Sequence, residues 1–520
     1  MSVNASRPGQ TRWLAAALMA LLVAGGAGGY YYYRTTHRPA RPPFVPEPPT
    51  ESIEAQVHHF CGGCHMYPPA ETFPKRHWKE EVERGYVFFN QAGKNLRPPP
   101  IDDVIQYYVQ RAPEELPMID AAPAKHPAPV RFEPIPIPGP PLAQPYAISH
   151  VSLVHLFGNK RPDILACDMR NGVVMALQPY AEKPRWKILG EVPNPAHAEV
   201  IDLDGDGILD ILVADLGNFK PTDRRCGSVV WLRGQRDGSF TPMPLLQDVG
   251  RVADVQAADF RGVGKLDLVV ASFGWNHIGE IIYLENHTTD WSKPVFKVRE
   301  LDSRHGAIHV PVVDLNGDGK PDFVAVLAQE HETVVAFIND GKGGFRKETI
   351  WEGPHPAYGS SGIQMVDMNG DGRLDVLYTN GDTLDTPYLL KPYHSVQWLE
   401  NPGDGKFPWK HHAIAPLYGA HRALAADLCG AGKMDVLAVS FLPPEALPQR
   451  QKLNLDALLL LERTGPTTFA RHALATVTCD AVTCAVGDIY GTGRSDLVTG
   501  LFTSTKSEHN ATIWKNLGRQ

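Results

Sequence analysis

The chain has 520 residues, enough for two or three domains that each bury a core. Its formal net charge is −8 with an ordinary number of charged residues, so the composition excludes a broad basic surface for nucleic acid. Glycine (47) and proline (46) are abundant beside many short runs of valine, isoleucine and leucine, which favours a turn-rich, mainly β body.

An uncharged stretch near the N-terminus, Trp13 to Tyr33, has about the length needed to cross a bilayer. Its last residues, Tyr30 to Tyr33, are typical of an aromatic belt at the membrane interface. A cleaved signal peptide is the alternative, with small residues around Ala27 as a weak cleavage site. The apolar run exceeds a typical signal core, so we expect an uncleaved anchor in residues 1–34, followed by a proline-rich spacer in 35–49.

The next segment ends in the sequence Cys61-Gly-Gly-Cys64-His65, after apolar residues at helical spacing over 51–65. This is the attachment pattern of c-type haem, in which two thiols reach the porphyrin vinyl groups and the imidazole is aimed at the iron. A thioredoxin-like redox pair and half of a zinc site are the alternatives. Neither fits well, because no βαβ unit surrounds the motif and no second cysteine pair has zinc spacing.

On this motif, residues 50–118 resemble a small class I cytochrome c. The spacing predicts a middle helix over 77–85 with Trp78 and Val82 inward, and a last helix capped by Asp102 and Asp103. Such cytochromes usually place a methionine before the last helix, but residues 86–100 contain none. The sixth iron ligand therefore stays open: there is none, or it is one of Met66, Met118, His77, His58 and His59.

The resemblance also implies a compartment. In bacterial cytochromes of this kind, haem is attached on the outer side of the inner membrane, so we expect residues 34–520 in the periplasm or another extracytoplasmic space. An oxidising compartment permits disulfides. Cys479 and Cys484 lie close enough in sequence to pair, but their spacing alone does not establish a bond.

After a linker, 119–130, one pattern recurs seven times at intervals of 47 to 61 residues, the length of a four-stranded propeller blade. The clearest copies span 202–210, 314–322 and 367–375, and weaker copies begin at His155, Asp259, Asp427 and Asp488. These copies resemble the FG-GAP/VCBS repeat family, known from integrin α-subunits and many bacterial surface proteins. The resemblance implies a seven-bladed β-propeller over residues 131–520.

Each copy predicts strands on both sides of the loop, then a third strand and a fourth. The fourth is expected to begin at an aromatic residue, namely Phe240, Phe296, Phe345, Phe407 or Phe469. The last copy has no fourth strand, whereas Arg131 to Ile137 reads as a fourth strand without a blade. Pairing the two would close the ring, with Pro134 and Pro136 on an outer edge.

The three clear loops place carboxylate or amide oxygens at positions 1, 3, 5 and 9, a spacing that suits Ca²⁺. Asp/Gly-rich turns without metal are the alternative, and in the weaker loops we expect aspartates to cap the turn. The expected calcium ligands are Asp202, Asp204, Asp206, Asp210, Asp314, Asn316, Asp318, Asp322, Asp367, Asn369, Asp371 and Asp375.

Counting five residues back from each loop gives one position on the innermost strand of every blade. This set is expected to face the central channel, and it contains His150, His197, Asp254, His309, Gly362, Arg422 and Thr483. Ordinary polar channel lining is the simpler interpretation of this channel ring, and a site that binds a metal, an anion or a substrate is the sharper one.

Three functions follow. The first is electron transfer by a membrane-anchored c-type cytochrome whose propeller binds or docks a redox partner. The second is an oxidoreductase in which the channel ring binds a substrate and the haem collects its electrons, by analogy with propeller dehydrogenases. The third is an adhesion or carbohydrate-binding protein. The sequence names neither the redox donor or acceptor nor a substrate.

Overall fold

The computed structural model describes residues 51–384 and 387–520. Within these residues no helix is long and apolar enough to span a membrane. The anchor predicted for residues 13–33 and the spacer predicted for 35–49 lie outside the described residues.

The N-terminal described segment is helical, as its apolar spacing predicts. Its elements are α2 (Ile53–Cys61), η1 (Ala70–Thr72), η2 (Lys75–His77), α3 (Trp78–Ala92) and α4 (Ile101–Arg111). Trp78 and Val82 are buried as predicted. The Trp78 ring stacks on Tyr108 of α4, with 3.8 Å between centroids, and its Nε1 donates to the Ala70 carbonyl. These contacts form the centre of a small core.

Two helix boundaries differ from the prediction. The middle helix does not stop at Gly85, because a helix tolerates an internal glycine; it ends before Gly93, whose φ of 60° is left-handed. The predicted capping by Asp102 and Asp103 is wrong, since Pro100 occupies the N-cap of α4 without a side-chain hydrogen bond. Both aspartates lie instead in the first turn, where their charge still favours the helix dipole.

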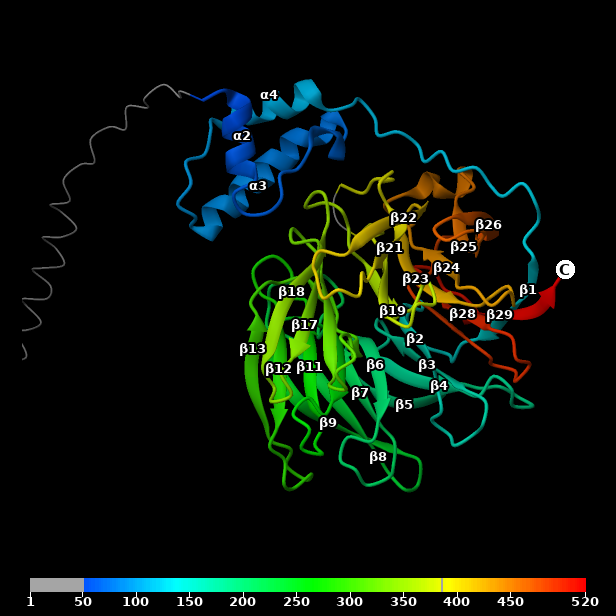
Figure 1. Cartoon of the computed structure of the whole chain (residues 1–520). Helices are drawn as coiled ribbons and strands as arrows, with labels where there is room; N and C mark the ends of the chain where they lie inside the picture. The colour runs from blue at the N-terminus through cyan, green and yellow to red at the C-terminus, as the bar shows by residue number, and fades with distance from the viewer. Residues whose placement is uncertain (1–50, 385–386) are drawn as a thin grey trace, which may run out of the picture. The chain divides into compact units, whose positions relative to one another are not determined.

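Residues from Val130 to the C-terminus form seven antiparallel sheets, the predicted mainly β, seven-bladed propeller (Figure 1). Blade one consists of β2 (Ile148–Val154), β3 (Asp163–Asp168), β4 (Val173–Leu177) and β5 (Lys187–Glu191), and blade two of β6 (Pro195–Ile201), β7 (Asp210–Asp215), β8 (Gly227–Gly234) and β9 (Phe240–Val249). Blade three consists of β10 (Val252–Ala258), β11 (Asp267–Ser272), β12 (Glu280–Asn286) and β13 (Phe296–Asp302). Blade four consists of β14 (Ala307–His309), β15 (Val312–Val313), β16 (Asp322–Leu327), β17 (Thr333–Asn339) and β18 (Phe345–Glu352). Blade five consists of β19 (Gly362–Val366), β20 (Asp375–Thr379), β21 (Ser395–Glu400) and β22 (Lys410–Pro416). Blade six consists of β23 (Ala420–Ala426), β24 (Asp435–Ser440), β25 (Asp456–Arg463) and β26 (Phe469–Thr476), with the short helix η3 (Pro448–Lys452) before β25. Blade seven consists of β27 (Cys484–Gly487), β28 (Asp496–Gly500), β29 (His509–Arg519) and β1 (Val130–Pro138).

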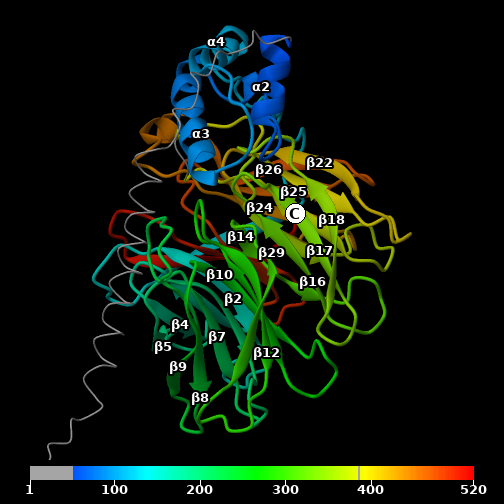
Figure 2. The same cartoon turned by 90° about the vertical axis from the view of Figure 1, so that its left-hand side faces the viewer.

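The ring closes as predicted. β1 pairs antiparallel with the C-terminal strand β29 and is the outermost strand of blade seven, which accommodates Pro134 and Pro136 on an edge (Figure 1). The first strands of the blades contact one another in cyclic order, from β2 through β6, β10, β14, β19, β23 and β27 back to β2. They are therefore the innermost strands, and Figure 2 shows β2, β10 and β14 close together near the centre of the view.

Two irregular strands have proline as their cause. Blade four divides its first strand into β14 and β15, because Pro311 between them has no N–H for the ladder with β16. Fourth strands begin at the predicted aromatic residues except in blade five. There β22 begins at Lys410 rather than Phe407, and Pro408 again removes a ladder donor.

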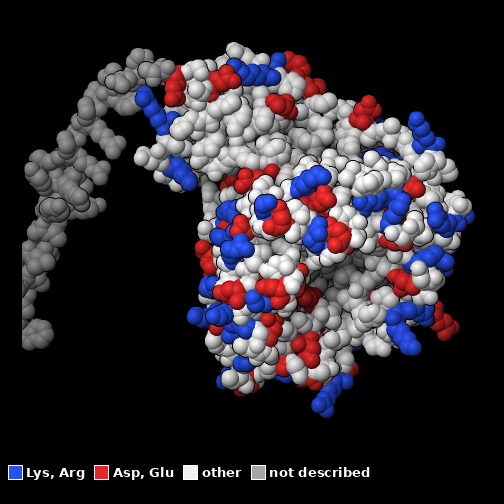
Figure 3. Space-filling model, viewed as in Figure 1, with Lys and Arg blue, Asp and Glu red and all other residues white. Residues whose placement is uncertain are grey.

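The surface in Figure 3 carries acidic and basic side chains intermingled over the propeller face in view. No broad single-sign patch covers that face. The face in view thus mixes both signs of charge, and Lys and Arg (50) and Asp and Glu (58) occur in similar numbers in the whole chain.

Candidate functional site

The Cys61–His65 motif lies at the end of α2. The helix ends at Cys61, so Cys64 and His65 follow it instead of lying within the helix expected over 51–65. Cys61 is half-buried and Cys64 is exposed. His65 donates from Nδ1 to the Met66 carbonyl at 2.7 Å, which leaves the lone pair of a neutral imidazole on Nε2. An imidazole oriented in this way is prepared to bind a metal through Nε2.

A cavity opens beside this motif. Burial raises the pKa of the Cys61 thiol, and the nearby Tyr108 hydroxyl lowers it in part. Gly85 of α3 faces the same cavity, and a Cβ built there would meet nothing within 4 Å. Within the helical segment the cavity walls are mostly apolar and include Phe60, Cys61, Cys64, His65, Trp78, Val82, Gly85, Tyr86, Phe89 and Tyr108. Two thiols, a free imidazole nitrogen and an aromatic wall fit a covalently held haem.

None of the five residues left open as a sixth iron ligand lines this cavity. His58 contacts Tyr107 instead, through a 3.0 Å hydrogen bond, and stacks on Tyr67. Met118 is 57% exposed, and burial lowers the pKa of His77 at the N-cap of α3. Among residues 51–118, the cavity wall therefore offers His65 no second histidine or methionine.

The three predicted calcium loops have similar local geometry. In blade four both oxygens of Asp314 accept backbone N–H groups, from Asp318 at 3.1 Å and from Gly319 at 2.9 Å. Glycines at loop positions 4 and 6 have positive φ, as at Gly317 (73°) and Gly319 (79°). The first aspartates of the weaker loops after β10, β23 and β27 make the same pair of bonds, which confirms the predicted capping.

Loop position 9 has a role that the sequence did not suggest. Asp322 is fully buried, and its oxygens accept the N–H groups of Leu315 at 3.1 Å and Asn339 at 2.7 Å, joining the loop to the third strand. Blades with incomplete loops keep this bond, so it does not depend on a metal. The aspartates that accept an N–H in this way are Asp210, Asp267, Asp322, Asp375, Asp435 and Asp496.

Each predicted calcium loop also has a basic partner. Arg233 lies 2.5 Å from Asp204, Lys320 lies 3.0 Å from Asp318, and Arg373 lies 2.5 Å from Asp371. Three ligand oxygens of the first loop, from Asp202, Asp204 and Asp210, lie within 4.8 Å of one another. In blade three Arg261 stands at loop position 3 and donates to Asp267 with two nitrogens, a guanidinium where the clear loops offer an oxygen.

The channel ring is brought together as predicted on the innermost strands. Asp254 of β10 lies between two histidines: its Oδ1 is 2.9 Å from Nδ1 of His197 and its Oδ2 is 3.8 Å from Nδ1 of His309. His150 packs edge-on against His197, with ring centroids 4.3 Å apart. Arg422 Nη1 lies 3.3 Å from His309 Nε2. Asp254 is buried, whereas the three histidines and Arg422 are partly exposed.

The environment separates the pKa values in this ring. Burial raises the pKa of Asp254, but His197 and His309 lower it more, to well below its ordinary value. Burial lowers the pKa of His197, but Asp254 raises it further, to above its ordinary value. For His150 and His309 burial dominates and the pKa falls. The ring thus contains one carboxylate–imidazole pair that can hold a proton.

Arg422 reaches His309 although blade five stands between their strands. The ring position of blade five is Gly362, and a Cβ there would lie 2.9 Å from the His421 carbonyl oxygen and 3.3 Å from Cδ of Arg422. The missing side chain therefore makes the space that Arg422 occupies. Glu199, two residues beyond the ring position of blade two, accepts the Ala257 N–H, and burial raises its pKa to about 7.

A buried carboxyl group lies outside all of these motifs. Glu332 is 2% exposed and accepts the N–H groups of Gly359 at 2.9 Å and Ser360 at 2.8 Å. Burial raises its pKa to about 8, and its φ is positive at 43°. Glu332 follows the second strand of blade four, where the repeat has no fixed residue type, so no sequence signal points to it.

The remaining cysteines form no redox centre among the described residues. Cys479 and Cys484 are both free and buried, without the disulfide that their spacing left open. Burial raises the pKa of both thiols, to about 11 and about 12. Thiols of this kind are mostly protonated at neutral pH and unreactive.

Comparison with solved structures gives similarities at low identity. An Agrocybe aegerita lectin described as recognising non-reducing terminal N-acetylglucosamine shares 18% identity, with a TM-score of 0.39 over 65% of this chain and 81% of its own. A chain of BBS1N in complex with ARL6DN shares 11%, with a TM-score of 0.43 over 75% and 97%. The V. cholerae biofilm matrix protein Bap1 shares 10%, with a TM-score of 0.41 over 75% and 91%. These values carry no functional assignment.

The family comparison agrees with the loop pattern. Comparison with curated proteins gives no match. The FG-GAP-like repeat family matches residues 314–378, which begin at the loop of blade four and include the loop of blade five. These two loops are clear copies of the repeat found in the sequence, and all seven blades follow the same strand order. The propeller is therefore built with FG-GAP-like repeats.

Proposed function

We propose that this protein is a membrane-anchored, extracytoplasmic c-type cytochrome that transfers electrons, with its propeller as a binding or docking platform. One observation carries the proposal: the Cys61–His65 motif borders an aromatic cavity, and His65 directs its Nε2 lone pair away from the Met66 carbonyl that holds Nδ1. A thioredoxin-like pair would not need that imidazole or that cavity.

Cys61 and Cys64 would hold haem c through thioether bonds, and His65 would bind its iron. Bound haem supplies one-electron transfer without a proton. The chain's own part is to orient the imidazole through the Met66 carbonyl and to exclude water with Trp78 and Tyr108. A drier, less polar surrounding favours the less charged state of the iron, so these walls would tune the redox potential.

The compartment and the anchor complete this proposal. Residues 13–33 would cross the bacterial inner membrane once, and the described residues would lie on its periplasmic side. A tethered cytochrome needs a surface that selects its redox partner, and a rigid propeller supplies one. The partner is a redox protein or a small electron donor or acceptor.

Calcium would stiffen this platform. The aspartate and asparagine oxygens at positions 1, 3 and 5 of the three clear loops would bind Ca²⁺, with Lys320 and Arg373 moving off their carboxylates. Position 9 already accepts two N–H groups, so it would contribute through its remaining lone pairs. Binding would replace an internal ion pair by a stronger cation contact and stabilise the blade.

The test is a reduced-minus-oxidised absorbance spectrum of protein matured with intact haem-attachment machinery. Wild type should carry one covalent haem, and the double variant Cys61→Ala, Cys64→Ala should be colourless yet folded. Cys226→Ala, which also removes a half-buried free thiol, is the matched control and should keep the haem. Colourless wild type with both motif thiols free would refute the proposal and leave adhesion or carbohydrate binding as the propeller's task.

A second candidate function is an oxidoreductase, and the Asp254 network favours it. A carboxylate that orients a neutral imidazole and stabilises the imidazolium formed on protonation is a common way to make a proton acceptor, as between Asp254 and His197. Substrate would bind at the channel ring, lose a proton to His197 or His309 and pass its electrons to the haem. Reduction of the haem by candidate donors should then fail in His197→Ala and His309→Ala, and persist in His155→Ala. Unchanged reduction in all three variants removes this candidate.

A further inference from the structure

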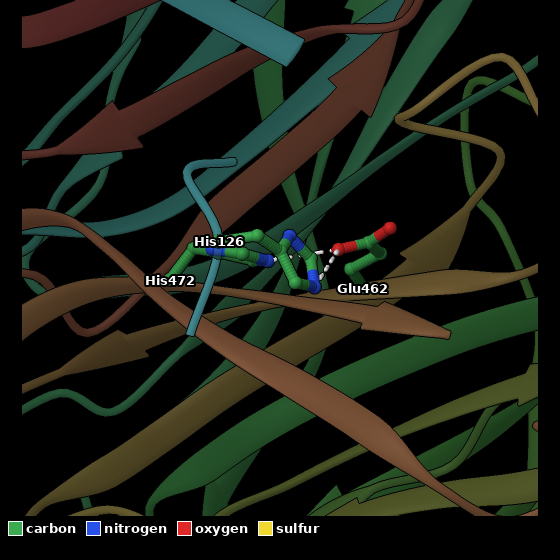
Figure 4. Close-up of side chains that lie close together, drawn as sticks. All are labelled: His126, Glu462 and His472. Carbon is green, nitrogen blue, oxygen red and sulfur yellow. Dashed lines mark hydrogen bonds and ion pairs between the residues drawn. The ribbon is translucent and has the colours of Figure 1, made fainter. Parts of the chain in front are cut away.

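Three metal-ligating side chains meet on blade six, where no repeat motif places a site. His472 Nε2 of β26 lies 2.9 Å from Oε2 of Glu462 on β25, and His126 Nε2 lies 3.8 Å from the same oxygen (Figure 4). One ligand atom from each residue falls within 4.8 Å of the others. His472 is buried, whereas His126 comes from the exposed segment that precedes β1.

Blade five supplies an internal comparison. Glu400 and His412 occupy the same register on β21 and β22 as Glu462 and His472 on β25 and β26. Nε2 of His412 lies 2.7 Å from Oε2 of Glu400. A carboxylate–imidazole pair at this position is thus a feature of the blade and not by itself a metal site. The two blades differ in what else surrounds the carboxylate.

In blade five the neighbour is a cation. Lys410 is opposite Glu400 in the sheet and its Nζ lies 3.3 Å from the carboxylate. In blade six the residue opposite Glu462 is Ala470, which leaves that side without charge. His126 approaches instead, an imidazole in place of an ammonium. Blade six therefore has an imidazole, which can bind a metal ion, where blade five has an ammonium group, which repels one.

The atoms of His126 are oriented for this role. Its Nδ1 donates to the Pro127 carbonyl at 3.1 Å, so a neutral ring keeps its lone pair on Nε2, the atom that faces Glu462. Tetrahedral zinc with ligand bonds of about 2.0–2.1 Å separates its ligand atoms by about 3.3 Å. The observed separations of 2.9 and 3.8 Å bracket this value.

We propose that His126, Glu462 and His472 bind one Zn²⁺, with water in the fourth position. Two imidazoles and a carboxylate are a common zinc donor set, and the exposure of His126 leaves room for the water. The site pins the linker to blade six just before the closing strand. Ala124 already donates to the Arg471 carbonyl at 2.9 Å, and Gln520 donates to Pro129 at 3.0 Å. Zinc would thus reinforce the junction where the two ends of the propeller meet.

The test measures zinc bound per full-length chain, with or without haem, in calcium-containing buffer after treatment with a zinc-selective chelator and dialysis. Titration of ZnCl₂ followed by calorimetry should give one site in wild type. His126→Ala and Glu462→Gln should weaken it at least tenfold. His412→Ala removes the equivalent imidazole of blade five and should bind zinc as wild type does. His126 is exposed, so His126→Ala should fold normally.

A second readout reports the linker directly. Zinc should slow trypsin cleavage after Lys125 in wild type and leave the rate unchanged in His126→Ala. If zinc binds wild type and His126→Ala equally, or protects Lys125 in both, the ion is held elsewhere and the proposal is wrong. Failure of wild type to bind zinc overturns it as well. None of these outcomes depends on the haem.

Discussion

Oδ1 of Asp254 lies 2.9 Å from Nδ1 of His197, and the two residues belong to the innermost strands of neighbouring blades. The contact joins blades two and three at the axis of the propeller. It also ties the charge of one blade to that of the next, since each group moves the pKa of the other.

Asp254→Asn should therefore destabilise the protein in a pH-dependent way. The pKa of His197 is raised in the folded state, so its contribution is fully present below about pH 6.5 and is lost as pH rises through the folded value. The depressed pKa of Asp254 keeps that carboxylate charged throughout this window. We expect the variant to lose roughly 3 kcal/mol of unfolding free energy near pH 6 and clearly less near pH 9.

Urea unfolding at the two pH values measures this difference, and NMR titration of the His197 imidazole measures its cause. In the variant that titration should move to lower pH, because burial then acts without the carboxylate. Equal losses of stability at both pH values would show that the carboxylate is needed for its shape and hydrogen bonds, such as the 2.9 Å bond from Val310, and not for its charge.

Gly362→Ala should disturb the channel ring through Arg422. The added Cβ would meet the His421 carbonyl at 2.9 Å and Cδ of Arg422 at 3.3 Å. Backbone oxygen cannot move away easily, so we expect a loss of about 1–3 kcal/mol. In an Arg422→Ala background the same substitution should cost less, since the contact with Cδ of Arg422 is gone and only those with the His421 carbonyl and Thr379 Oγ1 remain. A double-mutant cycle with chemical unfolding isolates this coupling; strict additivity would mean that Gly362 does not make space for Arg422.

Features that repeat in every blade could be predicted from the sequence, whereas single contacts between distant segments could not. The strands and the closure by β1 follow from the sequence, because alternation and loop motifs are local and repeat seven times. The channel ring follows too, since one register position recurs in each blade. Two contacts do not follow from the sequence: that of Arg422 with His309 across Gly362, and that of His126 with Glu462. Both depend on contacts between residues far apart in the chain, and no periodic pattern encodes them.

Calcium removal tests the three clear loops. Chelation with EGTA should lower the melting temperature of wild type, because repelling carboxylates lose their cation. Asp206→Ala, Asp318→Ala and Asp371→Ala each remove the position-5 ligand and should each lower the calcium content by one ion per chain. Thr492→Ala changes the same loop position in blade seven and is the matched control, with unchanged content. Three Asp variants that keep the wild-type calcium content would show that these turns need no metal.

Gly85→Leu tests the cavity beside the haem motif without touching any proposed ligand. Glycine inside α3 costs about 1 kcal/mol of helix stability relative to alanine, so leucine should stabilise the helix by a similar amount. Its side chain would nevertheless enter the cavity that Gly85 lines, and would compete there with the porphyrin. We expect a folded protein with less haem per chain, measured as the ratio of haem absorbance to protein absorbance. Glu83→Leu adds leucine to an exposed position of the same helix and should leave that ratio unchanged. If Gly85→Leu matched Glu83→Leu in haem content, the porphyrin would not occupy this cavity, and the two thiols would have to hold it on another face of α2.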